Sequence, residues 1–415
     1  MSVDAAGPVR RVVVVGASLA GLSTARALRA QGFDGVLSVV GEEVHRPYDR
    51  PPLSKDFLRL VDGPVEALES DAEDLAVSWR LGVRATALRA AAGRQPRVEL
   101  EDGSVLDADA VVLAVGATAR RDLPGVGLPG VHLLRTADDA AALREDLHRA
   151  ARSGEPVVAV GGGFIGSEVA ATARELGCRV TLVVPEDVPL REALGPYADA
   201  VADLHASHGV QVRAHARVEG VSPAPGGLLD VVLADGTRLP AATVVLGIGA
   251  APAVGWLAGS GLDLGPGGTG AVRCDEHGAT HLPGVYAVGD CAAWWSPGLG
   301  YHHQVEHWTS ARERGAVVAA RLLGAERIPA CRPPYVWSDL YGHKLQLAGF
   351  RDLADHPVGP EHTLVAGSVA DGSFAAVFRR SGEPVAVLAL DQPRYFAGIR
   401  RRLVTPVPAA LGDRA

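Results

Sequence analysis

Short runs of β-branched residues, each followed by a glycine-rich turn and an alanine-rich stretch, occur twice along the chain. The first run, 11–15, leads into a turn at 16–21, a helix to Arg29 and a second apolar run at 36–40. Strands that are apolar at successive positions are typical of a parallel sheet covered on both faces. The pattern predicts strand, tight turn, helix and strand, which is the order of a nucleotide-binding unit.

The same pattern recurs in the middle of the chain. An apolar run at 157–160 precedes a turn at 161–166, a helix and a further apolar run at 179–184. Two more runs, 110–116 and 242–249, each follow an Asp-Gly turn and are expected to return to a core strand. Two nucleotide-binding units are therefore predicted in one chain.

A third unit is expected after a helix at 309–323 and a proline-containing joint at 329–334. Its segments alternate or run apolar between glycine-bearing turns, which predicts strands at 335–340, 344–348, 374–379 and 385–390, closed by a helix at 393–403. This pattern indicates a small α+β domain.

Composition narrows the class of protein. The 415 residues are 47% hydrophobic and 21% charged, as expected for a folded globular chain of two or three domains. A net charge of -8 argues against a protein that coats nucleic acid. No apolar run approaches the roughly 18 residues that span a bilayer, and the N-terminus lacks the apolar stretch of a signal peptide. We therefore expect a cytoplasmic protein that binds neither nucleic acid nor membrane.

The cysteines and histidines do not suggest a metal site. The four cysteines have no CxxC spacing, and each is expected to be a buried small residue: Cys178, Cys274, Cys291 and Cys331. His302, His303 and His307 lie near Glu306, but this spacing suits no closed ligand set. No metal is expected.

The glycine-rich turns carry the strongest chemical signal. One GxGxxG is weak evidence, whereas two with correct flanks predict dinucleotide binding. The first glycine permits the tight turn, the second lets the backbone approach a pyrophosphate, and the third lets helix and strand pack closely. The middle turn has all three, Gly161, Gly163 and Gly166, whereas the N-terminal turn has Ser18 at the second position. The serine hinders close approach slightly, but its hydroxyl can donate to a phosphate.

Two further features belong to the first unit. Glu42 lies 26 residues after Gly16, at the end of a predicted strand, where a carboxylate can accept hydrogen bonds from an adenosine ribose. Glu43 is expected to be a solvated surface charge. Three prolines stiffen the loop at 46–55, which fits either a fixed ligand contact or a rigid surface loop with solvated charges.

Together with segments 287–290 and 306–308, these motifs resemble the FAD-dependent ferredoxin reductases of bacterial oxygenase systems, of the putidaredoxin reductase type. The resemblance covers roughly residues 10–390, and the Pro-Pro-Leu-Ser-Lys segment at 51–55 is specific to this group. It implies an α/β, glutathione-reductase-like fold that binds two dinucleotides. The implied domains are a discontinuous FAD-binding domain (1–117 and 246–325), an NAD-binding domain (118–245) and a C-terminal α+β domain (326–415).

The resemblance also implies roles for individual residues. Asp290, after a strand and before a helix, would bond the ribityl or pyrophosphate part of FAD; a plain helix N-cap is the alternative. Trp308 matches the position beside the isoalloxazine, with a buried core tryptophan as the alternative. Lys55 and Glu168 are expected to form a partly buried ion pair at the flavin–nicotinamide junction, as the catalytic pair. The implied cofactor-binding residues are Gly16, Ser18, Leu19, Ala20, Gly21, Glu42, Arg50, Lys55, Ala85, Ala114, Gly116, Arg135, Gly161, Gly163, Phe164, Ile165, Gly166, Glu186, Gly249, Gly289, Asp290, His307 and Trp308.

The chain departs from the family pattern at several positions. Val115 replaces a threonine and Phe164 a tyrosine, so two hydroxyls near cofactor are lost, and Leu340 replaces an amide expected at the flavin edge. Val184 stands where the family has a strand-end glutamate for the NAD ribose. Glu186 or its neighbour Asp187 can take that role.

The activity that the resemblance implies is hydride transfer from NAD(P)H to FAD, followed by single-electron transfers to an iron–sulfur ferredoxin. The ferredoxin would feed an oxygenase such as a haem-thiolate monooxygenase or a Rieske dioxygenase. NADH is expected to be preferred, because two carboxylates follow the strand at 179–184 and Arg191 is the nearest cation. Docking is expected through Arg312, Arg314 and the cluster 400–402, for which a solvated helix is the alternative.

Two other functions remain open. A non-catalytic flavoprotein that senses redox state or acts as a scaffold would have the same fold. A disulfide reductase or peroxidase needs a cysteine beside the flavin, and residues 40–60 contain none.

Overall fold

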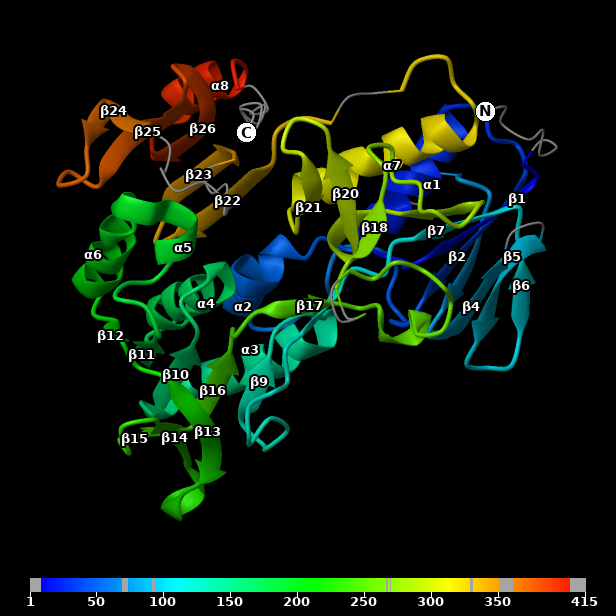
Figure 1. The fold of residues 1–415 in the computed structure, drawn as a ribbon. Helices are drawn as coiled ribbons and strands as arrows, with labels where there is room; N and C mark the ends of the chain where they lie inside the picture. Colours follow the sequence, from blue (N-terminus) through cyan, green and yellow to red (C-terminus); the bar gives the residue numbers. More distant parts are fainter. Residues whose placement is uncertain are drawn as a thin grey trace, which may run out of the picture.

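The computed structural model describes residues 9–68, 74–91, 94–265, 268, 270–328, 331–350 and 361–403. Two parallel sheets and one antiparallel sheet, of five strands each, form its three main bodies (Figure 1).

The first parallel sheet has the strand order β19-β7-β1-β2-β3. Its strands are β1 (Arg11–Val15), β2 (Val36–Gly41), β3 (Val77–Leu81), β7 (Ala110–Leu113) and β19 (Val285–Ala287). Helices α1 (Leu19–Ala30) and α7 (Trp308–Leu322) lie side by side along it (Figure 1). They cross closely because Gly315 has no side chain; a Cβ there would lie 2.7 Å from the amide nitrogen of Thr24.

The second parallel sheet has the order β12-β11-β10-β16-β9. Its strands are β9 (Val131–Leu133), β10 (Pro156–Val160), β11 (Arg179–Val183), β12 (Gln211–Arg213) and β16 (Thr243–Leu246). Helices α3 (Ala137–Ser153) and α4 (Phe164–Glu175) pack on it through one apolar cluster. A separate cluster joins the sheet to a meander of β13 (Val218–Pro223), β14 (Leu229–Leu233) and β15 (Arg238–Ala241).

The chain passes between the two units twice, through β8 (Ala117–Ala119) and β17 (Ala250–Pro252), which pair antiparallel. The first unit also carries two small sheets. One contains β4 (Ala85–Ala91), β5 (Arg94–Leu100) and β6 (Val105–Asp107), and the other contains β18 (Val272–Cys274), β20 (Ala292–Ser296) and β21 (Tyr301–Gln304).

The C-terminal sheet is antiparallel, in the order β22-β23-β26-β25-β24. Its elements are β22 (Tyr335–Leu340), β23 (His343–Gly349), β24 (Glu361–Ser368), β25 (Ser373–Arg380), β26 (Glu383–Leu390) and α8 (Pro393–Arg400). One buried cluster of this sheet includes residues of α5 (Arg191–Leu194) and α6 (Asp199–Ser207), which belong to the second unit. The C-terminal sheet therefore packs against the second nucleotide-binding unit (Figure 1).

The predicted α/β architecture with a C-terminal α+β domain is confirmed, and the predicted core strands match within a few residues. The apolar run at 110–116 ends as a strand at Leu113, and the run at 242–249 ends at Leu246. Residues 329–330 of the expected joint lie outside the described residues. Within the described chain, no helix is long and apolar enough to cross a membrane.

Candidate functional site

The first glycine turn is shaped by contacts that exclude a side chain. Gly16 has φ +121° and donates its amide to the Val40 carbonyl at 2.7 Å. A Cβ on Gly16 would lie 2.1 Å from the carbonyl oxygen of Ala114, and one on Gly21 would lie 1.9 Å from the Gly16 oxygen. These contacts hold the N-terminus of α1 at the carboxyl ends of β1 and β7, where a dinucleotide pyrophosphate binds in such folds.

The second glycine turn repeats this arrangement. A Cβ on Gly161 would lie 2.2 Å from the Gly247 oxygen, and one on Gly166 would lie 2.0 Å from the Gly161 oxygen. A Cβ on Gly163 would meet nothing within 4 Å, so packing does not require glycine there. Contacts within the chain therefore do not exclude a side chain at the second position, where the first unit has Ser18, which accepts a hydrogen bond from Arg50.

Arg50 ties the proline-rich loop to the first turn. Its Nε donates to Ser18 Oγ at 3.2 Å, its Nη2 donates to Glu43 Oε1 at 2.6 Å, and its Nη1 donates to the Arg135 carbonyl. The buried Tyr48 donates its hydroxyl to Glu43 Oε2 at 2.5 Å and accepts from the first amide of α3. The expectation that Glu43 is a solvated surface charge is wrong, because the fold of the loop brings two donors to it. Two cations of the loop, Arg50 and Lys55, are likewise ion-paired and not simply solvated.

Asp290 is paired with Arg135, whose Nη2 lies 2.9 Å from Oδ2. Gly116, at φ +68°, leaves room for that guanidinium, since a Cβ there would lie 3.3 Å from Nη2. Asp290 belongs to a single 3-10 turn, Gly289–Cys291, and the next α-helix begins only at Trp308. The expected placement before a helix, and the alternative of an N-cap to that helix, are wrong because the β20–β21 hairpin intervenes.

A cavity of about 340 Å³ lies at the N-terminus of α7, lined by residues 303–307 and Pro334. His307 is the residue before the helix, and its Nδ1 is buried with no hydrogen-bond partner in the described structure. Burial lowers the pKa of His307 to about 4, so its ring is neutral at pH 7. An unpaired buried nitrogen beside a cavity fits a position that a bound molecule satisfies.

Trp308 follows directly and is partly exposed rather than buried in the core. Its Nε1 donates to Asp49 Oδ1 at 2.6 Å, which fixes the ring against the proline-rich loop. The Trp337 ring meets it edge-on, with centroids 5.8 Å apart, and the Arg312 guanidinium lies 5.4 Å from its centroid. Two tryptophans, from α7 and from the C-terminal sheet, therefore stand together at this site.

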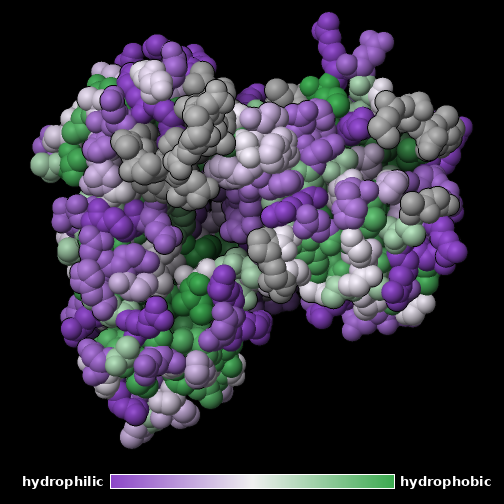
Figure 2. Space-filling view, in the orientation of Figure 1, coloured by the Kyte–Doolittle hydropathy of each residue, from purple (hydrophilic) through white to green (hydrophobic). Residues whose placement is uncertain are grey.

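Lys55 and Glu168 join the two units. Lys55 Nζ lies 2.8 Å from Glu168 Oε1, and the two residues are 7% and 5% exposed. Glu168 is on the first turns of α4, whereas Lys55 ends the proline-rich loop. The N-terminus of α4 is thus held against the loop that Arg50 ties to the first glycine turn. In Figure 2 the surface is hollowed where the two units and the C-terminal sheet meet.

The two acids that could bind the NAD ribose in the second unit, Glu186 and Asp187, have different surroundings in the structure. Val184 is fully buried, and its Cγ1 backs the turn at Gly162. A Glu186 carboxylate oxygen lies 3.2 Å from the place of a Cβ on Gly162, over the glycine turn. Asp187 instead receives two hydrogen bonds from Arg191, at 2.8 and 2.6 Å, which lower the pKa of that carboxyl. Of the two, Glu186 lies beside the turn.

The remaining expected site residues lie at several separate places in the two nucleotide-binding units. Glu42 is exposed and paired with Arg84. Ala85 is buried in β4, and Ile165 is 41% exposed on the first turn of α4. Gly249 has φ +101° at the crossing between the two units. The other members lie in or beside the glycine turns: Leu19, Ala20, Phe164 and Gly289.

Four residues that complete the site were not predicted from the sequence: Tyr48, Asp49, Ser54 and Ser338. The first three lie in the proline-rich loop, so the stiffness of that loop was the sequence signal that could have pointed to them. Leu340, which replaces the family's amide, is 1% exposed and packs in a cluster with Ala171 of α4.

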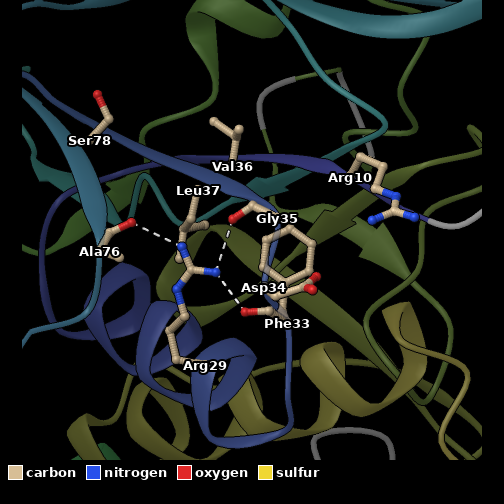
Figure 3. Close-up of a pocket in the computed structure, with 9 residues that line it drawn as sticks. All are labelled: Arg10, Arg29, Phe33, Asp34, Gly35, Val36, Leu37, Ala76 and Ser78. Atoms are coloured by element: carbon tan, nitrogen blue, oxygen red, sulfur yellow. Dashed lines mark hydrogen bonds between the residues drawn. The ribbon is translucent and has the colours of Figure 1, made fainter.

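A larger depression, of about 680 Å³, lies at the other end of the first sheet, around Arg29 (Figure 3). Arg29 donates to the carbonyls of Phe33, Gly35 and Ala76 at 2.6, 3.0 and 2.9 Å. The Arg29 guanidinium therefore binds main-chain carbonyls near the start of β2. Nucleotides bind at the opposite edge of such a sheet, at the carboxyl ends of its strands. We assign this depression a structural role.

Known proteins resemble the chain over almost its whole length. A family model described as pyridine nucleotide-disulphide oxidoreductase matches residues 10–315, and one described as reductase C-terminal matches residues 335–414. The ferredoxin reductase component of chlorobenzene dioxygenase from Cupriavidus sp. (strain PS12) is 38% identical over 97% of this chain and 95% of its own. The ferredoxin--NAD(+) reductase subunit of the benzene 1,2-dioxygenase system from Pseudomonas putida is 38% identical over 95% and 92%.

Solved structures agree with the sequence relatives. The reductase in the covalent putidaredoxin reductase–putidaredoxin complex is 31% identical, with a TM-score of 0.85 over 97% of this chain and 95% of that one. With the two glycine turns, the proline-rich loop and the C-terminal sheet in place, the chain belongs to the pyridine nucleotide-disulphide oxidoreductase family and, within it, to the ferredoxin reductases of bacterial oxygenase systems.

Proposed function

We propose that the protein is a cytoplasmic, NADH-dependent ferredoxin reductase that supplies an oxygenase with electrons. The observation that carries this proposal is the Lys55–Glu168 ion pair. It holds the glycine turn of the second unit against the loop that is hydrogen-bonded to the glycine turn of the first. Two dinucleotides bound at the two turns would therefore approach one another at this pair.

FAD and NAD(P)H are the cofactors of this family. When bound, the flavin accepts a hydride from the nicotinamide and passes the electrons on singly. The first unit fits FAD, because the turn at Gly16 has no room for a side chain and the buried Nδ1 of His307 has no partner among the described residues. The protein's task is to bind, orient and shield the two rings.

The site residues divide into tasks. The α1 N-terminus with Ser18 and Arg50 would hold the FAD pyrophosphate, Asp290 the ribityl chain and Glu42 the adenosine ribose. Arg135 holds the Asp290 carboxylate in place. The backbone of Gly116, Ala85 and Ala114 would line the same crevice, and Trp308 would cover the flavin ring. In the second unit, Gly161, Gly163, Gly166 and Glu186 would hold NADH.

We assign residues 1–117 and 246–325 to the FAD-binding domain, 118–245 to the NAD-binding domain and 326–415 to the C-terminal domain. The pairing of β8 with β17 supports boundaries within a few residues of these positions, with Leu246 still in strand β16 of the second sheet. The C-terminal domain would close the crevice, since it brings Trp337 against Trp308.

The partner would be an acidic iron–sulfur ferredoxin that docks beside the two tryptophans. Arg312 is exposed over Trp308, and Arg400 lies 4.1 Å from the centroid of Tyr335, which stacks on Trp337. Arg314 is wrong as a docking candidate: it is 8% exposed and lies under the Trp294 ring. Arg401 and Arg402 follow α8 and are exposed.

The decisive experiment is an anaerobic titration of the yellow holoprotein with NADH and with NADPH, followed by cytochrome c reduction with and without a ferredoxin. We expect complete flavin bleaching by NADH and cytochrome c reduction that depends on ferredoxin. A protein that NADH bleaches but that passes no electrons to any ferredoxin would be a redox sensor. No bleaching would remove the proposed function.

Thiol chemistry has no support. Cys178 and Cys291 are buried, and burial raises the pKa of each thiol to about 11, so neither is a thiolate at pH 7. Cys274 is buried as well. Cys331 lies at the surface, contrary to the expectation that all four cysteines are buried. Among the described residues, no group of three or more His, Cys, Asp or Glu side chains is arranged to hold a metal ion.

A further inference from the structure

The carboxylate of Glu168 accepts from three separate groups of the chain. Ser54 Oγ donates to Oε2 at 2.5 Å, and Lys55 Nζ lies 2.8 Å from Oε1. Ser338 Oγ, from strand β22 of the C-terminal sheet, donates to the same Oε1 at 2.7 Å. Ser338 is fully buried, so water does not compete with its hydroxyl.

The alternation along β22 explains how Ser338 reaches α4. Ser338 and Leu340 are buried, whereas Trp337 between them is partly exposed. Successive side chains of a strand point to opposite faces. Leu340 shares a cluster with α4, on the same face as the Ser338–Glu168 bond, and Trp337 contacts Trp308 on the other. One strand of the C-terminal sheet thus contacts both the ion pair and the tryptophan of α7.

Ser338 and Lys55 share one oxygen of Glu168. Without the serine hydroxyl, Ser54 on Oε2 would be the one remaining hydroxyl donor to this carboxylate in the described structure. The terminal torsion of a glutamate is broad, so the carboxylate could turn and draw Oε1 away from the ammonium. Lys55 would then keep the carbonyl of Pro51, at 3.1 Å, as its other hydrogen-bond partner.

We propose that Ser338 is a positioning residue, which acts through Glu168 to hold the Lys55 ammonium at the junction of the FAD and nicotinamide sites. This inference rests on the proposed function, which places the flavin beside Lys55. A fixed cation favours the negative charge that develops on a group as it is reduced. The C-terminal domain therefore tunes the flavin as well as covering it.

The test uses holoprotein with FAD bound and three variants. Ser338→Ala removes the hydroxyl and Ser338→Thr keeps it. Ser373→Ala is the matched control, because its hydroxyl accepts from Gln392 at 2.8 Å in the same sheet, away from Glu168. The flavin midpoint potential is measured by anaerobic equilibration with a redox dye, beside the rate of flavin reduction by NADH, the KM for NADH and the melting temperature.

We expect Ser338→Ala to shift the equilibrium about tenfold toward oxidised flavin, which is about 30 mV for a two-electron couple. Flavin reduction by NADH slows, while the KM for NADH stays unchanged. Ser338→Thr and Ser373→Ala keep the wild-type potential. In a Glu168→Gln background, Ser338→Ala has no further effect on the potential, because the group through which it acts is gone.

A Ser338→Ala protein with a lower melting temperature but wild-type potential and reduction rate overturns the proposal, since its role would be structural alone. If that variant does not retain flavin, Ser338→Cys, with similar shape and a weak donor, takes its place with the same expected and opposing outcomes. A wild-type flavin that NADH does not reduce removes the proposed function. Normal wild-type reduction with an unchanged Ser338→Ala potential removes the positioning role alone.

Discussion

Lys55 and Glu168 form a buried ion pair, with Nζ and Oε1 2.8 Å apart, across the boundary between the two nucleotide-binding units. A surface pair with the same distance, Arg89 and Glu99, is available for comparison in the β4–β5 hairpin. Removing one member of a buried pair leaves an uncompensated charge and costs about 3–5 kcal/mol. Exposed pairs contribute about 0–1 kcal/mol.

We therefore expect the double-mutant cycle of Lys55→Ala and Glu168→Ala to give a coupling energy well above 1 kcal/mol. The cycle is measured by chemical unfolding, with Arg89→Ala and Glu99→Ala as the control cycle. Additive effects of the two buried substitutions would contradict the assignment.

FAD is expected to be held without a covalent bond. Covalent attachment through sulfur needs a thiolate, and burial raises the pKa of Cys291, the residue after Asp290, to about 11. Precipitation of the protein by mild heat or acid should leave intact FAD in the supernatant, measured by its absorbance and fluorescence. Yellow colour that stays with the precipitated chain would show the opposite.

Ferredoxin docking is expected to be electrostatic in spite of a net charge of -8. Arg312→Gln and Arg400→Gln should each lower ferredoxin-dependent turnover several-fold, because each removes a cation beside the paired tryptophans. NADH-dependent reduction of ferricyanide, which needs no docking, should stay the same. Arg89→Gln, remote from this surface, is the control.

Salt gives an independent readout of the same docking surface. Turnover with ferredoxin should fall as ionic strength rises, since screening shortens the range of attraction to about 10 Å at 0.1 M. Turnover that is equal at low and high salt would remove electrostatic docking, whatever the two arginine variants do.

The glycine turns and their flanking strands could be predicted because the information is local. Gly16 and Gly161 have positive φ angles and touch backbone, and apolar runs before them leave few alternatives to a buried strand. Strand β24 was missed because its residues are mostly exposed, with a bulge, and show no clean alternation.

The partners of polar groups could not be predicted in the same way. Glu43 is ion-paired because the proline-rich loop curls back and places Arg50 beside it, which no local spacing encodes. Ser338 lies 170 residues from Glu168 in sequence, and only the docking of the C-terminal sheet on α4 brings them together. Asp290 was misplaced because the apolar run after it, 292–296, forms a hairpin strand and not a helix.

Stability is expected to fall in mild acid through His205 of α6, which is fully buried and hydrogen-bonded to the Tyr341 hydroxyl. Burial, with His208 nearby, lowers the pKa of His205 to about 4 from an ordinary value of 6.5. The unfolded chain binds this proton below 6.5 and the folded chain only near 4. Stability is therefore fully present above pH 6.5 and is lost as the pH falls toward 4, by at most about 3 kcal/mol.

Melting temperatures from pH 7.5 to pH 4.5 check this expectation. His205→Gln removes the titrating group, so its melting temperature should fall less over this range than that of the wild type. An equal fall in both proteins would assign the acid sensitivity to other groups, such as the partly buried His303, whose pKa burial also lowers.

The choice of nicotinamide is expected to depend on two neighbouring acids with different tasks. The Glu186 carboxylate lies over the glycine turn, where it can accept hydrogen bonds from the ribose hydroxyls of NADH. Asp187 neutralises Arg191, whose guanidinium also binds Asp199, so the nearest cation in sequence is not free to hold a 2′-phosphate. NADH should therefore have the higher kcat/KM.

Glu186→Gln should raise the KM for NADH several-fold with little change in kcat, because the lost contact is made equally in the ground and transition states. Asp187→Asn should raise kcat/KM for NADPH by weakening the hold on Arg191, while leaving NADH turnover nearly unchanged. Steady-state kinetics of both variants with both nucleotides separate the two tasks. A wild-type enzyme with the higher kcat/KM for NADPH would instead indicate that another arginine, such as Arg213 at the end of the adjacent strand β12, reaches the ribose.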